Sequence, residues 1–201
     1  MIEDPYKYAT EERIAKLREV IEKRTQNLSV ILENINDPHN LSACLRSCDS
    51  VGINSVSLIY HGKQPFPKLG NKSSASARKW VDTTRYDSVE ECFDKLRQEG
   101  KKIYTTHMSK ESVSLYDLDL SEPCALMFGN EHAGVSDKAV ELADANFLIP
   151  QVGMIQSLNI SVACAVSVYE AYRQRHKKGL YSSSEFSEDE INKMMYDWVR
   201  R

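Results

Sequence analysis

The sequence predicts an α/β fold in which a mostly parallel sheet carries helices on both faces. Short apolar, β-rich runs alternate along the chain with longer segments whose apolar residues recur at helical spacing. This alternation is typical of parallel strands joined by crossover helices. Hydrophobic residues make up 41% of the 201 residues, enough for a proper core, so one domain with terminal additions is the simplest expectation.

The N-terminal part predicts a helix, a strand and a second helix. Residues 10–24 place four apolar residues on one helical face: Ile14, Leu17, Val20 and Ile21. Residues 28–32 are β-rich, and Pro38 then opens a helix that Asn36 or Asp37 can cap. That helix should end at Gly52 and turn four residues inward: Leu41, Cys44, Leu45 and Cys48.

The middle of the chain continues the alternation. Strands are predicted at residues 55–60, 81–86 and 102–106. Between the last two, Ser88 caps a helix that runs to Gln98 and stops at Gly100. Residues 117–120 predict a turn or a short helix.

Two strands and a long helix in the C-terminal part should meet at one place. Residues 125–128 form an apolar run that ends in Gly-Asn-Glu-His-Ala-Gly, and residues 147–149 form another that ends in Pro150. Ser157 is a favoured N-cap for a helix that reaches His176. Ligands of open α/β sheets usually lie at the carboxyl ends of strands, so we expect a binding site here.

The long helix and the chain end have predicted apolar sides. The buried stripe of the long helix is predicted to contain Leu158, Val162, Ala165, Val166, Tyr169 and Tyr172. Ser187 and Glu190 form a capping box for a terminal helix, which should pack on its own domain or on a partner subunit. The apolar side of that helix is predicted to contain Ile191, Met194, Met195 and Trp198.

Several classes of protein are disfavoured by what the sequence lacks. No glycine-rich dinucleotide or P-loop motif occurs, and Cys164 lacks the local signals of a catalytic nucleophile. Five scattered cysteines suit a reducing cytoplasm, and Cys44 with Cys48 favours a core role over a metal site, so no metal is expected. No apolar stretch is long enough to span a bilayer and the start does not resemble a signal peptide, which favours a cytoplasmic location.

Three ordered motifs resemble one known family. The strings are F-G-N-E-H-A-G, then I-P followed by G-M-I-Q-S-L-N-I-S-V-A, and upstream N-L-S-A-C-L-R-S-C-D-S-V-G. They resemble the signatures of the SPOUT methyltransferases, and among these the TrmH-like RNA ribose 2′-O-methyltransferases. The resemblance covers roughly residues 28–178. It implies a SPOUT fold with a deep C-terminal trefoil knot, which topology rules alone would have excluded.

The resemblance also implies a cofactor, S-adenosylmethionine, and the residues that bind it. By position in the motifs these are Thr106, Gly129, Ile149 and Leu158, with Met154 nearby. An adenine edge needs backbone donors and acceptors, and a dry pocket needs apolar walls. For Ile149 and Leu158 alone, packing in the core explains the residue type equally well.

The catalytic set that the resemblance implies is Asn40, Arg46, Glu131, Ser157 and Asn159. The family assigns Arg46 the role of proton acceptor, although a milder role as a clamp for phosphate stays open. Its neighbours are small or apolar, so we expect Arg46 to lie beside packed structure. Glu131 is expected to brace its loop rather than take the proton, while the other three position groups by hydrogen bonds. The family is homodimeric, and Arg46 would serve the partner's cofactor site.

The partner that the resemblance implies is RNA. Net charge is −3, but basic residues cluster at 13–24, 72–79 and 173–178, and each cluster is either a phosphate-binding face or an ordinary solvated surface. The loop residues Lys63, Lys68, Lys72, Arg78 and Lys79 are further candidates for phosphate contacts.

The chain divides into a helical extension at 1–27, a methyltransferase domain at 28–178 and a C-terminal helical extension at 179–201. The short first segment favours a tRNA enzyme that modifies guanosine in the D-loop. A ribosomal RNA enzyme, a catalytically inactive RNA-binding relative and a flavodoxin-like small-molecule enzyme remain as alternatives.

Overall fold

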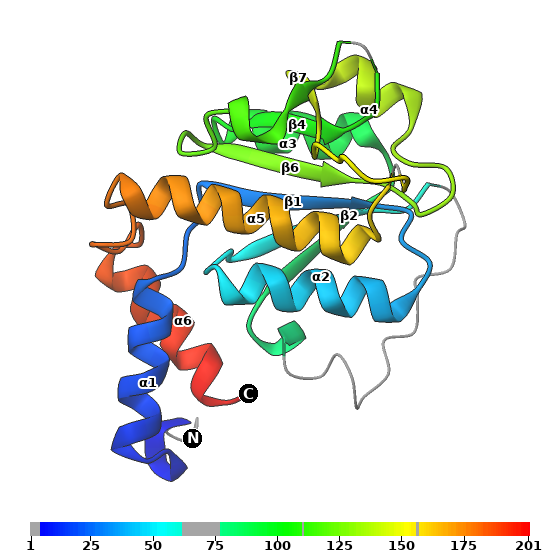
Figure 1. Cartoon of the computed structure of the whole chain (residues 1–201). Coiled ribbons are helices and arrows are strands. Elements are labelled where there is room, and N and C mark those ends of the chain that lie inside the picture. Colours follow the sequence, from blue (N-terminus) through cyan, green and yellow to red (C-terminus); the bar gives the residue numbers. More distant parts are fainter. Residues whose placement is uncertain (1–4, 62–76, 110, 156) are drawn as a thin grey trace.

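The described residues of the computed structural model are 5–61, 77–109, 111–155 and 157–201. They contain seven strands in one sheet, and all neighbouring strands pair in parallel. The order across the sheet is β3-β2-β1-β6-β4-β7-β5 (Figure 1). The strands are β1 (Leu28–Glu33), β2 (Ser55–Ile59), β3 (Asp82–Tyr86), β4 (Lys102–Thr106), β5 (Val113–Ser114), β6 (Cys124–Phe128) and β7 (Ala145–Leu148). The predicted α/β fold with a mostly parallel sheet is confirmed.

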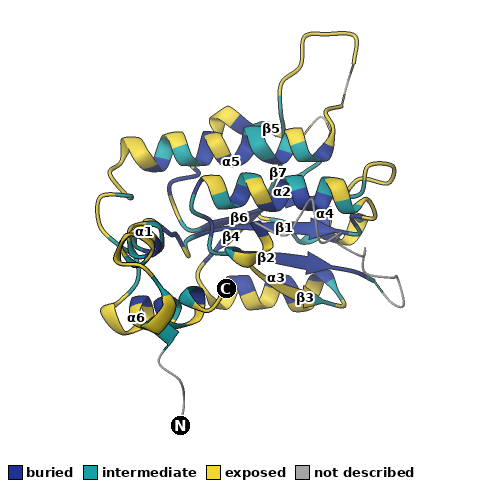
Figure 2. Ribbon diagram, turned by 90° about the horizontal axis from the view of Figure 1, so that it is seen from below, coloured by how far each residue is buried: buried dark blue, intermediate teal, exposed yellow. Residues whose placement is uncertain are grey.

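Helices cover both faces of this sheet. The helices are α1 (Glu11–Glu22), α2 (Pro38–Ser50), α3 (Val89–Gln98), α4 (Asp137–Leu142), α5 (Ile160–Lys177) and α6 (Glu188–Val199). Short 3-10 turns are η1 (Pro5–Tyr8), η2 (Ala77–Lys79) and η3 (Leu115–Asp117). Side chains of α2 and α5 enter the core on one face, and those of α3 and α4 enter it on the other. The central strands β1 and β6 are accordingly buried, whereas the edge strand β3 and the outer sides of the helices are exposed (Figure 2).

Side chains at the helix starts explain where several helices begin. Asp37 accepts from the backbone N–H of His39, and Pro38 occupies the first turn of α2, where its missing N–H costs nothing. Ser88 caps α3 through the N–H of Glu91. All of these starts were predicted from the sequence, as was the capping box of α6.

The central strands are buried on both faces, which explains their continuous apolar character. Every residue of β1 and β6 is buried. Alternate residues of β1 point to opposite sides, so Val30 packs toward α2 and α5 while Ile31 packs toward α3 and α4. The four predicted inward residues of α2 are all buried, as expected from their helical spacing: Leu41, Cys44, Leu45 and Cys48.

Helix α5 differs from the prediction in both its start and its buried face. It begins at Ile160, and its N-cap is Asn159 rather than Ser157. Its buried residues are Ile160, Cys164, Ser167, Val168, Glu170, Ala171 and Arg175. Leu158, Val162 and Tyr169 are exposed in the single chain. Val166 and Tyr172 of the predicted stripe are partly buried against the core, so the stripe was only partly correct. It was rotated toward the outer face because the helix carries apolar residues on that face as well.

The two ends of the chain pack against each other. Helices α1 and α6 lie side by side (Figure 1) and share a small apolar cluster of their own around Ile21 and Trp198. Arg24 was predicted to lie on the basic outer side of the first helix, but it is buried. Its guanidinium donates to the carbonyl of Ile53, forms an ion pair with Asp49 and lies 5.1 Å from the Trp198 ring centroid. The predicted division at residues 27 and 178 stays a prediction.

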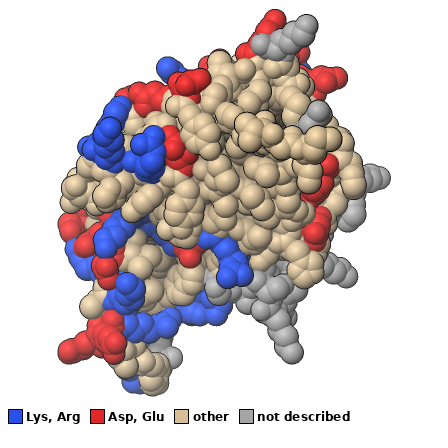
Figure 3. All heavy atoms as spheres, viewed as in Figure 1, with Lys and Arg blue, Asp and Glu red and all other residues tan. Residues whose placement is uncertain are grey.

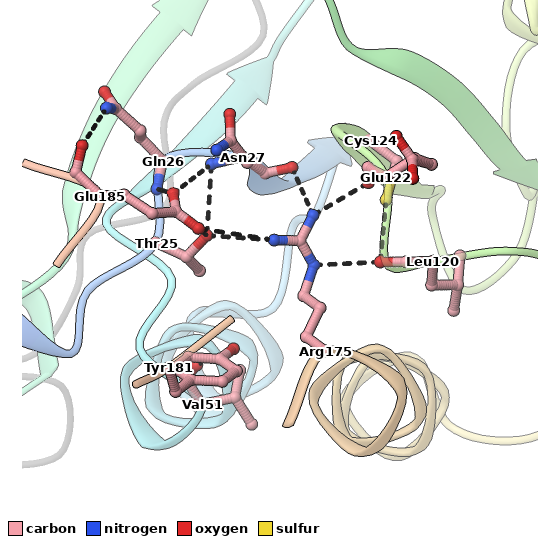
Figure 4. Close-up of polar contacts among 10 residues, drawn as sticks. All are labelled: Thr25, Gln26, Asn27, Val51, Leu120, Glu122, Cys124, Arg175, Tyr181 and Glu185. Carbon is pink, nitrogen blue, oxygen red and sulfur yellow. Dashed lines mark hydrogen bonds and ion pairs between the residues drawn. The ribbon is translucent and has the colours of Figure 1, made fainter. Parts of the chain in front are cut away.

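Arg175 fixes the end of α5 to the start of β1. This side chain is only 1% exposed, so it does not belong to the predicted basic surface at 173–178. Its guanidinium donates to the carbonyls of Leu120, Asn27 and Glu122 at 2.9–3.0 Å (Figure 4). Because each carbonyl is close to a strand or helix end, one buried cation satisfies acceptors that the secondary structure leaves open.

Glu185 adds the C-terminal extension to the same network. Its carboxylate accepts from the Thr25 hydroxyl and the N–H of Gln26, both at 2.8 Å, and lies 3.7 Å from the Arg175 guanidinium (Figure 4). The segment between α5 and α6 is therefore held against the turn between α1 and β1.

Three of the predicted phosphate-binding residues, Lys63, Lys68 and Lys72, lie outside the described residues. Among the helices that the structure describes, none is both long and apolar enough to cross a membrane.

Candidate active site

A cavity of about 440 Å³ lies at the carboxyl ends of β6, β4 and β7, beside the start of α5. Its position is the one predicted from the two apolar runs and the helix start. Its lining residues are Thr106, His107, Met108, Phe128, Gly129, Asn130, Glu131, Gly134, Phe147, Leu148, Ile149, Gln151, Ser157, Leu158, Asn159, Ile160 and Ala163. The walls are largely apolar, and polar side chains lie among them.

Four of the five predicted cofactor residues line this cavity: Thr106, Gly129, Ile149 and Leu158. Met154 does not. Its side chain is 98% exposed, and its neighbours Val152 and Ile155 are exposed as well. Sequence position placed Met154 near the cavity, but these residues belong to a loop whose side chains turn to solvent instead of packing on the wall.

Gly129 has a steric reason to be glycine. The chain after β6 folds back on itself, and Asn130 and Gly134 exchange two backbone hydrogen bonds of 2.9 and 2.8 Å. A Cβ at Gly129 would lie 2.1 Å from the carbonyl group of Gly134 and 2.2 Å from the nitrogen of Val135. The contact that excludes a side chain is therefore with the backbone of this turn, whereas the sequence suggested contact with a ligand.

Three of the predicted catalytic side chains form one hydrogen-bonded chain. Asn40 of α2 donates to the Glu131 carboxylate at 2.7 Å, and Asn159 donates to the side-chain oxygen of Asn40 at 3.2 Å. The side-chain oxygen of Asn159 in turn accepts from the N–H and hydroxyl of Ser161. Residues far apart in the sequence, on α2, after β6 and at the start of α5, are thus brought together. Ser157 lies on the cavity wall beside them.

Arg46 lies elsewhere. It is exposed on α2, outside the cavity lining, which corrects the expectation that it lies beside packed structure. The expectation was wrong because it was based on the small and apolar residues near Arg46 in the sequence. Helix α2 buries the side that carries those residues, and Arg46 lies on the opposite side. No hydrogen bond or ion pair engages Arg46 among the described residues.

Polar residues that the motif analysis did not single out hold the turn after β6 in place. Asn130 donates to the carbonyl of Asn34, and its side-chain oxygen accepts from the N–H of His132 at 2.9 Å. Buried Glu33 accepts from the N–H of Ser136 at 2.8 Å and contacts His61 at 2.7 Å. The sequence signal was present, because Glu33 ends the strand that neighbours β6 and Asn34 directly follows it.

The cysteines lie in the core. All five are buried, and none forms a disulfide. A hydrogen bond with Cys164 and burial raise the pKa of the Cys44 thiol well above its ordinary value. Burial likewise raises the pKa of Cys92 to about 12. Within the described ranges no group of three or more ligand-type side chains could hold a metal ion.

Comparison with known proteins defines the class to which this fold and site belong. Residues 27–169 match the model of the SpoU rRNA methylase family, and the chain belongs to that family. The resemblance seen in the motifs is thereby confirmed.

Particular relatives include enzymes named tRNA (guanosine(18)-2′-O)-methyltransferase. The chain is 40% identical to that of Aquifex aeolicus, over 94% of this chain and 89% of the relative. It is 39% identical to that of Thermus thermophilus, over 96% and 98% of the two chains. The solved A. aeolicus TrmH/SpoU tRNA modifying enzyme superimposes with a TM-score of 0.88, at 40% identity, over 94% of this chain and 95% of that one. An AdoMet-bound rRNA methyltransferase from Sinorhizobium meliloti is more distant, with a TM-score of 0.66 at 28% identity, over 78% and 59%.

Proposed function

We propose that this chain is an S-adenosylmethionine-dependent methyltransferase that modifies the ribose 2′-hydroxyl of a guanosine in the D-loop of tRNA. The observation that carries the proposal is the cavity at the carboxyl ends of β6, β4 and β7, with Asn40, Glu131 and Asn159 joined at its edge. Relatives that match along nearly their whole length are named as tRNA enzymes with this specificity. A tRNA substrate would place the chain in the cytoplasm.

The lining of the cavity fits the cofactor. Phe128, Phe147 and Ile160 supply apolar walls of the kind that an adenine ring needs. The backbone at the ends of β4, β6 and β7 borders the same space, so amide and carbonyl groups are available for its polar edge. When bound, S-adenosylmethionine supplies a methyl group on a positively charged sulfur, ready for transfer to an oxygen nucleophile.

The protein's own task is to hold the ribose and to lower the cost of releasing the proton of its 2′-hydroxyl to solvent water. Asn40 and Asn159 are fixed by their mutual hydrogen bond and by Glu131, so their remaining donors are oriented in advance. A guanidinium keeps its proton throughout the physiological pH range and is a poor base. We therefore assign Arg46 to the RNA phosphate and to the developing alkoxide, where a fixed positive charge stabilises the transition state.

We also propose that two copies complete each site. The larger apolar side chains of α5, Val162 and Tyr169, are exposed in one chain, as is Leu158 just before it. A second copy packed on this face would cover them and bring its Arg46 to the neighbouring cavity. We further propose, from family membership, that the last strands and α5 form a deep trefoil knot.

Ribosomal RNA is the competing substrate. A 23S rRNA (guanosine-2′-O-)-methyltransferase of Coxiella burnetii is 33% identical, but the match covers only 64% of that protein. The tRNA enzyme of Thermus thermophilus is matched over 98% of its length. This difference in coverage favours tRNA.

The test is methyl transfer from labelled S-adenosylmethionine to unmodified tRNA and, separately, to unmodified ribosomal RNA, followed by mapping of the modified nucleotide. We expect label at a D-loop guanosine of tRNA and little in ribosomal RNA. Transfer to ribosomal RNA alone would overturn the substrate assignment. Binding of both cofactor and RNA without any transfer would identify an inactive RNA-binding relative.

A further inference from the structure

We propose that Arg78, on the turn η2, is a second contact for the RNA backbone and that the C-terminal helix α6 positions it. This rests on the proposed tRNA substrate and adds a surface to it. Arg78 is exposed, and no hydrogen bond or ion pair holds its guanidinium within the described part of the chain. Since η2 packs against α2, Arg78 and Arg46 belong to neighbouring elements. Basic side chains gather below α2 on this face, around η2 and the end of α6 (Figure 3).

Cations on the terminal helix α1 are less suited to this role. Lys16 and Lys23 both contact the carboxylate of Glu19, at 3.0 and 2.8 Å. Arg18 forms ion pairs with Glu22 and Glu188, both at 2.7 Å. A phosphate that approaches these side chains meets a carboxylate beside each cation. These three cations are therefore largely neutralised and offer little net attraction to RNA, whereas Arg13 on the same helix is exposed and has no carboxylate partner among the described residues.

The basic cluster at the end of α5 is also largely engaged. Arg173 forms a two-bond contact with the Glu170 carboxylate at 2.8 Å, and Arg175 is buried. Lys178 lies 3.4 Å from Asp119 and 3.9 Å from Glu122. Arg46 and Arg78, by contrast, have no carboxylate partner among the described residues. A free guanidinium at the surface is the group that a phosphate oxygen can engage at the lowest cost.

The C-terminal helix α6 and the residues after it contact the segment that contains η2. Trp80, directly after η2, packs on Trp198 of α6 with ring centroids 5.0 Å apart. Arg201 donates to the carbonyl of Lys79 and lies 3.5 Å from the Asp82 carboxylate. These contacts hold the residues directly after Arg78, while buried Ala77 before it belongs to the main core cluster. Helix α6 and the chain end therefore restrain the backbone on the C-terminal side of Arg78.

Helix α6 is itself tied to the domain, which makes the support rigid. Trp198 is only 3% exposed, and the buried guanidinium of Arg24 lies over its ring. The segment that leads into α6 is fixed by Glu185 and Arg175, as Figure 4 shows. A cation on a restrained backbone loses less conformational entropy when it binds than one on a free loop. Trp198 is thus a positioning residue for Arg78.

The first experiment measures the affinity of an unmodified tRNA transcript for Arg78→Gln across a range of salt concentrations. We expect affinity to fall about five-fold and the slope of log affinity against log salt to fall by about one, as for the loss of one phosphate contact. Lys95→Gln is the matched control, because it removes one positive charge from α3 on the opposite face of the sheet. Calorimetry should show unchanged affinity for S-adenosylmethionine in both variants.

The second experiment tests the positioning role. Trp198→Ala should weaken tRNA binding to a similar degree and Trp198→Phe should largely restore it, while cofactor affinity stays unchanged. Combining Trp198→Ala with Arg78→Gln should add no further loss, since both changes remove the same contact. Fully additive losses would show that α6 does not act through Arg78.

The inference would be overturned if Arg78→Gln showed the same slope of log tRNA affinity against log salt as the wild-type protein, provided that the wild-type protein methylates tRNA. If the wild-type protein neither binds nor methylates tRNA, the proposed function itself is wrong. Assays of the wild-type protein therefore distinguish a failure of the proposed function from a failure of the Arg78 contact.

Discussion

At the scale of single residues, we predict opposite effects on cofactor binding for alanine substitutions at Gly129 and Gly153, although both glycines lie in the family motifs. Gly129→Ala should abolish cofactor binding, because the new Cβ would collide with the backbone of Gly134 and push the turn out of place. Gly153→Ala should bind normally, since nothing lies within 4 Å of the position that its Cβ would occupy. Calorimetry with S-adenosylmethionine on variants whose circular dichroism matches the wild type checks both. Equal affinities for the two variants would contradict the steric explanation.

Arg46 carries the second prediction at this scale. Arg46→Ala should lower single-turnover methylation of tRNA by about 10²-fold or more, the usual effect of removing a charge that acts in the transition state. Arg46→Lys should lower the rate of methylation to a similar degree, because an ammonium lacks the planar fork of a guanidinium. Cofactor affinity and melting temperature should hardly change, since Arg46 is exposed and lies outside the cavity. Near-normal turnover would remove Arg46 from the catalytic set.

The sequence identified most of the candidate site at this scale, because the motifs name residue types whose chemistry is distinctive. It could not show that Asn40, Glu131 and Asn159 bond to one another, since they come from separate elements. It also could not show that Met154 lies outside the cavity lining in the single chain, because the direction of a loop side chain has no local sequence signal. Its role in cofactor binding stays a prediction.

At the scale of elements, Arg175 connects helix α5 to the start of the sheet. Arg175→Gln should lower the free energy of unfolding by about 3 kcal/mol, because three carbonyls from two segments would lose their donor. Lys177→Gln, on the exposed side of the same helix, should change it by no more than about 0.5 kcal/mol. Urea unfolding monitored by fluorescence measures the free energy of unfolding of both variants. A difference near zero would mean that water replaces the guanidinium without cost.

Six of the seven strands and several helix starts were predicted, because capping side chains and buried strands leave local signals, whereas the two-residue β5, the short α4 and the start of α5 were not. Ser88 and Ser187 accept backbone N–H groups as their helix-start positions required. The buried face of α5 was only partly predicted, because the helix has two apolar faces: Val166 and Tyr172 do pack against the core. Periodicity alone cannot tell which of them meets the sheet: Cys164 and Ala171 do, while Val162 and Tyr169 do not.

At the scale of the whole molecule, the proposed dimer predicts that two inactive variants can restore each other's activity, which a site within one chain would not allow. If each site combines Arg46 of one copy with Asn159 of the other, Arg46→Ala and Asn159→Ala should both be nearly inactive alone. A co-expressed, randomly paired mixture should recover about a quarter of the wild-type activity, because half of the dimers then hold one intact site of two. Light scattering should report a dimer as the active species. A mixture as inactive as its components would contradict a shared site.

The central claim is that the acceptor atom is the ribose oxygen of one guanosine in tRNA, and one measurement tests it most directly. Two ligated tRNAs are compared in single-turnover methyl transfer, identical except that the mapped guanosine carries a 2′-hydroxyl in one and a 2′-hydrogen in the other. We expect full transfer to the first and none to the second, with similar binding of both. Transfer to the tRNA that lacks this hydroxyl would contradict the claim.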